Sequence, residues 1–268
     1  MRLFQTSIVI ALLNLFICPV AAQTGVSVSP PRLYFEINEG HSSTQKVVVT
    51  NVSTNHTLNL TVSLNDWAYD LKGENITYAA GSLPNSCAGW VTIKEADKYF
   101  SLKPGELKEI EVTITTPDTL PDSIGAHTAL LFVTQMNPVN DMDYRGTDIK
   151  VSVRSGIKIF HKTVRAKNKR VEIRNLTFDK EQKNIVLSFD NTGAIWCDGT
   201  IYTDLLNTET GKKIPAQHIV FYTMPGNKRE TRILLPENLE KGKYTATIIM
   251  DYGIEDMMEV AELTFSYE

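Results

Sequence analysis

Residues 147–160 have the sequence TDIKVSVRSGIKIF, and this stretch indicates the fold more directly than any other. Ile149, Val151 and Val153 alternate with polar residues, which is the period-2 pattern of a β-strand with one apolar face. The polar run NPVNDMDYRG at residues 137–146 precedes this strand and is typical of a mobile loop. We therefore expect an extended strand that is entered from a loop.

Two cations are candidates for a binding role beside this strand. Lys158 follows the alternating residues, and Arg32 comes just before another expected strand at residues 33–37. An apolar strand that ends near two cations could hold an extended peptide by its backbone and its terminal carboxylate. The alternative is that the alternating residues fill their own core and that both cations are ordinary surface charges. The two possibilities differ in whether Arg32 and Lys158 are adjacent in space.

The first 22 residues have the composition of a secretory signal peptide. Arg2 provides the positive start, residues 8–17 form a short apolar core, and Ala21 and Ala22 are small residues suited to cleavage. The apolar run is too short to span a bilayer. A lipid anchor on Cys18 is the less favoured alternative, because bulky residues precede it. We expect a periplasmic or secreted mature chain.

The charge balance disfavours nucleic acid and anionic membranes as partners, because 27 basic residues stand against 31 acidic ones. The basic run at residues 161–170 is expected to be a solvated linker that leads into a strand. Outside the leader the cysteines are Cys87 and Cys197, too few for a disulfide framework. We expect two buried thiols, with one bridge between domains as the alternative.

Most of the remaining chain consists of short apolar segments bounded by turn residues, as expected for β-strands. The expected strands of the first half are residues 26–28, 32–37, 43–51, 58–69, 90–93, 99–103, 107–115, 127–135 and 149–164. Those of the second half are residues 171–178, 184–190, 200–206, 218–222, 231–235, 244–251 and 258–267. This spacing predicts an all-β fold with two Ig-like β-sandwich domains in tandem, at residues 23–164 and 165–268. We expect Trp67 in the core of the first sandwich.

Motifs of catalysis and metal binding are missing from the sequence. It contains no H-E-x-x-H, C-x-x-C or G-x-S-x-G pattern and no glycine-rich phosphate loop. The five histidines are scattered, without the spacing of metal ligands. Asp251 and the acidic pair at residues 255–256 flank Gly253 in an expected hairpin turn, which indicates solvated charges. We expect a binding protein without a cofactor; a triad assembled from distant strands is the alternative.

Residues 24–165 resemble the amino-terminal domain of PapD-like periplasmic pilus chaperones. The segments that carry the resemblance are SPPRLYFEI (29–37), LNDWAYD (64–70), SLKPGE (101–106) and the stretch at 147–160. The second half is similar to this family only as a second sandwich. LPNSCAGWVTI (83–93) and LPENLEKGKYTATIIMDYG (235–253) are similar to a branch of secreted proteins in Bacteroidetes.

The resemblance implies a role in assembling pilus-like or surface subunits. In that family an arginine and a lysine anchor the subunit's terminal carboxylate, and Arg32 and Lys158 fall on those positions. The apolar residues before the lysine lend a missing strand to an incomplete pilin by donor-strand complementation, and they correspond to Ile149, Val151 and Val153. The implied partners are protein subunits and an outer-membrane usher. Nucleic acid and small-molecule substrates are not implied.

The sequence departs from that family after the lysine, where His161 and the next two residues replace the usual Arg-Pro. The family's interdomain acid is replaced near His127, and residues 71–98 are longer than expected. These departures disfavour a conventional usher-dependent chaperone. The alternative function is that of a non-catalytic structural or adhesive Ig-like cell-surface protein. A weak self-dimer that covers its own donor strand is a further expectation.

Overall fold

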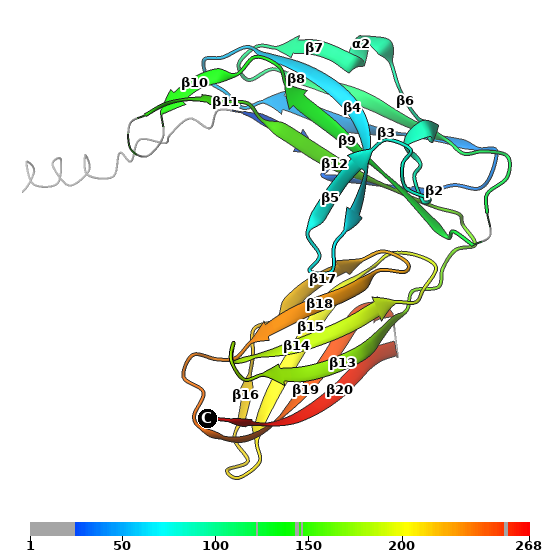
Figure 1. Cartoon of the computed structure of the whole chain (residues 1–268). Helices are drawn as coiled ribbons and strands as arrows, with labels where there is room; N and C mark the ends of the chain where they lie inside the picture. Colours follow the sequence, from blue (N-terminus) through cyan, green and yellow to red (C-terminus); the bar gives the residue numbers. More distant parts are fainter. Residues whose placement is uncertain (1–24, 122, 143–144, 146, 255–256) are drawn as a thin grey trace, which may run out of the picture.

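The computed structural model describes residues 25–121, 123–142, 145, 147–254 and 257–268, and these form two groups of packed β-sheets (Figure 1). This arrangement confirms the expected all-β fold with two Ig-like sandwiches. The expected signal peptide lies outside the described residues, as does the acidic pair at 255–256. No helix in the described part of the chain is long and apolar enough to cross a membrane.

The first sandwich packs two sheets face to face. One sheet has the order β1-β3-β8-β6, and the other has the order β2-β12-β9-β4-β5, with β7 also paired to β4. The elements are β1 (Val26–Ser29), β2 (Arg32–Glu36), β3 (Ser42–Asn51), β4 (Leu58–Tyr69), β5 (Asn75–Ala79), η2 (Ala88–Trp90), β6 (Val91–Ile93), α2 (Glu95–Lys98), β7 (Tyr99–Leu102), β8 (Leu107–Thr115), β9 (Ala126–Gln135), β10 (Val139–Met142), β11 (Asp148–Val151) and β12 (Arg154–Lys162). Strand alternation places one apolar row of each sheet in the core, as in β8, where Ile110, Val112 and Ile114 are fully buried.

The second sandwich has a three-stranded sheet β13-β14-β18 and a sheet β16-β15-β19-β20, with β17 also paired to β15. Its strands are β13 (Val171–Asp179), β14 (Asn184–Asn191), β15 (Cys197–Asn207), β16 (Lys213–Pro215), β17 (Ile219–Thr223), β18 (Lys228–Leu234), β19 (Gly242–Ile254) and β20 (Met257–Tyr267). The strand of this sandwich that was not expected from the sequence is β16, which pairs with the end of β15 across the turn at Gly211; in the first sandwich, β5 and β10 were not expected. Phe189, Phe221 and Tyr244 lie in the core.

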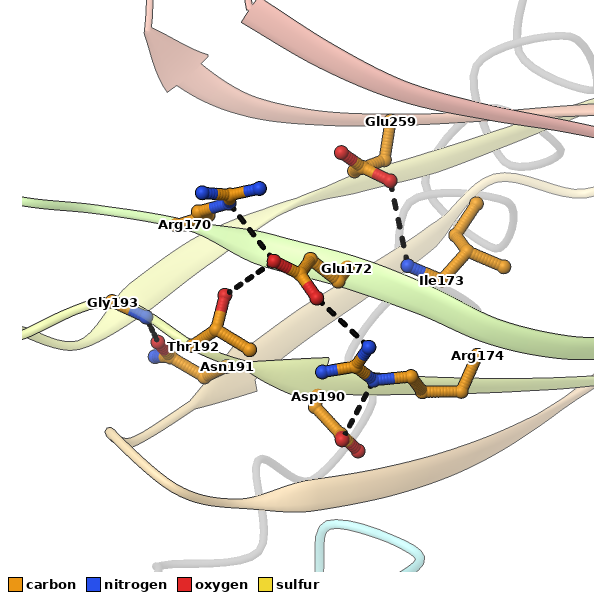
Figure 2. Close-up of polar contacts among 9 residues, drawn as sticks. All are labelled: Arg170, Glu172, Ile173, Arg174, Asp190, Asn191, Thr192, Gly193 and Glu259. Carbon is orange, nitrogen blue, oxygen red and sulfur yellow. Dashed lines mark hydrogen bonds and ion pairs between the residues drawn. The ribbon is translucent and has the colours of Figure 1, made fainter.

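Strand β13 lies at the edge of its sheet and carries charged residues, which Figure 2 shows. Its register with β14 shifts between Ile173 and Asn175. The carboxylate of Glu172 forms ion pairs with Arg170 and Arg174 at 3.0 and 2.9 Å. A side-chain oxygen of Glu259 on β20 accepts a long hydrogen bond from the backbone N–H of Ile173 at 3.5 Å. Edge strands are commonly protected from further pairing by charges and bulges of this kind. This edge is therefore poorly suited to the addition of another strand.

A third apolar cluster joins the two sandwiches. It contains Trp67, Ala126, Leu130 and Phe160 from the first sandwich and Ile195 and Met224 from the second. The prediction that Trp67 fills the core of the first sandwich is wrong in location, although the ring is buried. Leu58, Leu60 and Val62 of the same strand face the core, and the odd-numbered Trp67 lies on the opposite face. The second sandwich covers that face.

The expected solvated linker begins later than predicted, because β12 continues to Lys162. His161 is fully buried beside His127 of β9, and their two Nδ1 atoms lie 3.4 Å apart. Nε2 of His161 lies 3.0 Å from the carbonyl oxygen of Ile37, to which it donates. Burial lowers the pKa of both imidazoles, that of His127 to about 4. The pair is therefore neutral at pH 7.

Both cysteines outside the leader are free and buried, as expected. Cys87 belongs to the core of the first sandwich and Cys197 to the core of the second. Burial raises the pKa of each thiol, that of Cys197 to about 11. Buried thiols with a raised pKa are chemically inert at neutral pH.

Candidate functional site

Arg32 and Lys158 are adjacent in the structure. Strands β2 and β12 run parallel, and Lys158 is the direct partner of Arg32 at the start of their ladder. Partner residues project from the same face of a sheet, here the face that is turned toward the second sandwich. The two cations that the sequence singled out are therefore brought together at the place where β2 begins.

The ammonium group of Lys158 lies in an aromatic and amide environment. Its Nζ donates hydrogen bonds to the hydroxyl of Tyr69 at 3.0 Å and to Oδ1 of Asn75 at 2.6 Å. It also lies 4.0 Å from the ring centroid of Trp67. Burial, with additional repulsion from Arg32 and Arg229, lowers the pKa of Lys158 to about 8. An incoming carboxylate would relieve this unfavourable charge.

The guanidinium of Arg32 rests on the ring of Tyr222, which comes from β17 of the second sandwich, at 4.3 Å from its centroid. Beside it, Tyr34 stacks on Phe160 at 5.0 Å and lies 5.6 Å from Trp196. The cavity that Arg32 shares with these rings has a volume of about 10 Å³. That volume is close to the minimum for one water molecule, so a carboxylate cannot enter there without movement of a side chain.

A third cation, Arg229 of β18, was not identified from the sequence. It is only 6% exposed, and one of its terminal nitrogens donates to the carbonyl of Lys72 at 3.2 Å while the other donates to the carbonyl of Tyr222. Its buried Nε has no hydrogen-bond partner in the described structure. Arg229 lies in a polar run, KRETR, which resembles an exposed strand. Its partners come from β17 and from the first half of the chain, so they have no signal in that run.

The ion pairs within the described part of the chain include none of these three cations. The junction between the sandwiches therefore holds a cluster of positive charge that is compensated by rings, carbonyl groups and amides instead of carboxylates. Clusters of this kind are attractive sites for anionic groups.

The predicted single strand at residues 147–160 is divided into β11 and β12. The division lies at Ser152 and Val153, where hydrogen bonds to Gln135 interrupt the regular ladder. The backbone N–H of Gln135 donates to Val153 O at 2.9 Å, and the carbonyl of Gln135 accepts from the Ser152 hydroxyl at 2.6 Å. The expected loop at residues 137–146 contains strand β10, which pairs with β11 as a hairpin. The prediction of an uninterrupted loop and strand is therefore wrong in this segment.

The alternating apolar residues lie outside the core of their own sandwich. Ile149 is 38% exposed, and Val151 and Val153 are partly buried. The core cluster of described residues includes Ile157 and Ile159 of the same segment and none of these three. The possibility that they fill their own core is therefore not supported.

The backbone edge that leads to the cations is open in the sense that it has no ladder partner on one side, although Gly25, just before β1, lies against the side chain of Val153. Within the described residues, β2 pairs with β12 only from Lys158 to Lys162, whereas β9 pairs with β12 over its whole length. Residues 154–157 therefore have a ladder partner on one side. An extended segment could pair with this edge and would end beside Arg32, where β2 begins.

A larger cavity of about 380 Å³ lies between the sandwiches, next to the cluster that contains Trp67. Its lining includes Asn85, Gly125, Ala194 and Met224, and none of its lining residues is titratable. In the described residues there is also no group of three or more histidine, cysteine, aspartate or glutamate side chains placed to hold a metal. The cavity carries no arrangement of groups that indicates a reaction.

No family model and no curated protein matches the sequence. Solved structures that resemble this one include the chaperone–tip-subunit complex of the Csu pili of Acinetobacter baumannii, at 14% identity and a TM-score of 0.48, covering 89% of this chain and 98% of that chain. The Escherichia coli chaperone DraB matches at 16% identity and a TM-score of 0.47, covering 91% and 96%.

A Porphyromonas gingivalis protein of unknown function also matches, at 16% identity and a TM-score of 0.29, covering 89% of this chain and 98% of that chain. Similarity at this level describes the fold and does not assign the chain to a family.

Proposed function

We propose that the protein is a non-catalytic periplasmic chaperone that binds pilus-like or surface subunits by donor-strand complementation. The observation that supports this proposal most directly is the position of Arg32 and Lys158 as ladder partners at the end of an open strand edge. The edge would pair with the backbone of the subunit, and the two cations would bind its terminal carboxylate after a side chain beside Arg32 has moved to make room for it.

The direction of the bound strand follows from the geometry of β2. Since the carboxylate would lie at Lys158 and the rest of the subunit strand along residues 149–157, that strand would run parallel to β12. Strand β2 runs in the same direction and begins at Arg32. The subunit strand would therefore take the place in the sheet that β2 leaves free.

The energy of capture would come from apolar burial and from charge pairing. An Ile or Val that becomes well buried, as Ile149 and Val151 would under a subunit, contributes on the order of 1.5–3 kcal/mol. Removing one partner of a desolvated charge pair typically costs about 2–5 kcal/mol. The apolar row supplies affinity, and the cations determine the register.

A capture experiment tests this proposal. The tagged protein is purified from its native periplasm beside a Lys158→Ala variant and a Lys103→Ala control, since Lys103 is an exposed residue in the Pro104-Gly105 turn. We expect a β-rich subunit to co-purify with the wild type and the control and to be lost from Lys158→Ala. No subunit with any of the three would overturn the proposal and favour a structural surface protein.

In the absence of a subunit, the open edge at residues 149–157 is expected to pair weakly with that of a second copy. Unpaired edges are templates for another chain. Light scattering over a range of concentrations should then show a dimer that dissociates on dilution. A strict monomer at high concentration would contradict this expectation.

A further inference from the structure

The β4–β5 hairpin reaches from the first sandwich toward the second (Figure 1). Its turn is tightly closed by its own hydrogen bonds. The backbone N–H of Asp70 donates to Glu74 O at 2.9 Å, and Gly73 N donates to Asp70 O at 3.1 Å. The side chain of Asp70 also accepts from Glu74 N at 2.7 Å. The turn is therefore an ordered structural unit.

Two consecutive residues of β18 bind this turn. The backbone N–H of Glu230 donates to the carbonyl of Leu71 at 2.7 Å. The guanidinium of Arg229 donates to the carbonyl of Lys72 in the turn and to the carbonyl of Tyr222 in the second sandwich. Arg229 thus links backbone atoms of both sandwiches with its two terminal nitrogens.

Gly73 is the residue that lets Arg229 enter the turn. Its φ of +88° is in the left-handed region, which favours glycine. A Cβ added at Gly73 would overlap the guanidinium group of Arg229. A larger residue at this position would have to displace the arginine or deform the turn.

The residues on either side of the same turn hold Lys158. Tyr69 is the last residue of β4, Asn75 is the first residue of β5, and the two are cross-strand partners. The Nζ of Lys158 donates to both of them. The turn that binds the second sandwich is therefore the same turn that holds the proposed anchor of the subunit carboxylate.

We propose that Arg229 is a positioning residue, which fastens the β4–β5 turn to the second sandwich and thereby holds Tyr69 and Asn75 against Lys158. This inference rests on the proposed function only for the role of Lys158 as an anchor. Asn75 and Tyr69 are neutral acceptors, so they orient the ammonium group without compensating its charge. The charge remains available to a carboxylate.

The first test measures the junction without a subunit. Nitroxide labels on Lys103→Cys and Lys212→Cys, both exposed and on different sandwiches, report the distance between the sandwiches by pulsed electron resonance. Cys87 and Cys197, the cysteines outside the leader, are buried and should not be labelled. Gly73→Ala is compared with Gly81→Ala, since Gly81 has a φ of +77° and no atom within 4 Å of an added Cβ.

We expect a narrow distance distribution for the wild type and Gly81→Ala, and a broad one for Gly73→Ala and Arg229→Gln. Both glycine substitutions introduce the same kind of backbone strain, so a difference between them comes from the displaced guanidinium. A distribution for Gly73→Ala as narrow as that of Gly81→Ala would overturn the role of Arg229 in fastening the turn.

The second test measures Lys158 itself. The pKa of its ammonium group is followed by NMR in the wild type, Gly73→Ala and Gly81→Ala, all of which keep the charge of Arg229. We expect the pKa to rise in Gly73→Ala, since the released hairpin admits water to the ammonium group, and to stay at the wild-type value in Gly81→Ala. An unchanged pKa in Gly73→Ala would show that Arg229 only joins the sandwiches. Neither test uses a subunit, so a failure of the wild type to capture one would overturn the proposed function alone.

Discussion

Lys158 stands directly opposite Arg32 in the parallel ladder between β12 and β2, with its ammonium group against Tyr69 and Asn75. The pairing places both cations where the open edge of β12 ends. It also places them against the second sandwich, because the ring of Tyr222 lies on Arg32. The proposed binding of a subunit and the junction between the sandwiches therefore depend on the same residues.

Replacing Lys158 should weaken binding without destabilising the fold. Lys158→Met keeps an apolar stem over Trp67 and removes a charge whose lowered pKa indicates that the folded state disfavours it. We expect an unfolding midpoint at least equal to that of the wild type. Affinity for a peptide with the subunit's carboxyl-terminal sequence should fall by about 2 kcal/mol, roughly thirtyfold. Loss of stability with unchanged affinity would contradict this prediction.

The pH dependence of capture should follow the ammonium group of Lys158. The pKa of about 8 means that the group is mostly charged at pH 7 and loses its proton as the pH rises through that value. The affinity for a free carboxyl terminus should therefore decrease above pH 8, while a carboxyl-terminal amide should bind weakly at every pH. Calorimetric titration between pH 6.5 and pH 9.5 checks this; a flat profile for the acid would argue against Lys158 as the anchor.

The apolar row should matter only on its own face of the strand. Ile149→Lys places a charge where a subunit side chain would be buried, so we expect at least a tenfold loss of capture, about 1.4 kcal/mol or more. Lys150→Ala, on the other face of the same strand, is the matched control and should leave capture unchanged. Because Ile149 is outside the core, neither change should alter the thermal unfolding midpoint. Equal effects of the two variants would refute the donor-strand assignment.

The first sandwich should lose stability in mild acid because of His127. Burial lowers its pKa to about 4 from an ordinary value of 6.5, so the unfolded chain binds more protons between these values. The free energy of unfolding should therefore fall as the pH drops through this window, by about 2 kcal/mol at pH 5 relative to pH 8. Urea titrations of wild type and His127→Gln measure this contribution.

The control for that experiment is His218→Gln, which changes an exposed histidine of the second sandwich. The variant at His127 should show a smaller loss between pH 8 and pH 5, and the control should behave as the wild type does. A wild-type stability that does not change over this range would contradict the burial of a neutral imidazole pair.

The fold could be predicted because strand alternation is a local signal. Residues such as Ile110, Val112 and Ile114 define a buried face within a few positions of sequence. The interruption at Ser152 could not be predicted in this way, since it depends on a hydrogen bond with Gln135, the last residue of β9. Arg229 was missed for the same reason, because its partners are carbonyl groups on the β4–β5 turn and on β17.

The two cations of the candidate site could be selected from the sequence, whereas the residues that hold Lys158 could not. Arg32 and Lys158 were selected from the motif of the chaperone family, and the ladder between β2 and β12 brings them together. The acceptors of Lys158 had no such signal. Tyr69 ends the expected strand at residues 58–69, and Asn75 lies in residues 71–98, which were recognised only as longer than in that family. Neither pattern indicated that the two side chains would meet Lys158.

The most direct test of the central claim is affinity purification of the tagged protein from its native periplasm, with wild type beside Lys158→Met. The account predicts that a β-rich subunit accompanies the wild type and is lost from the variant, while both proteins fold equally well. The same subunit recovered in equal amounts with both proteins would contradict a carboxylate anchor at Lys158.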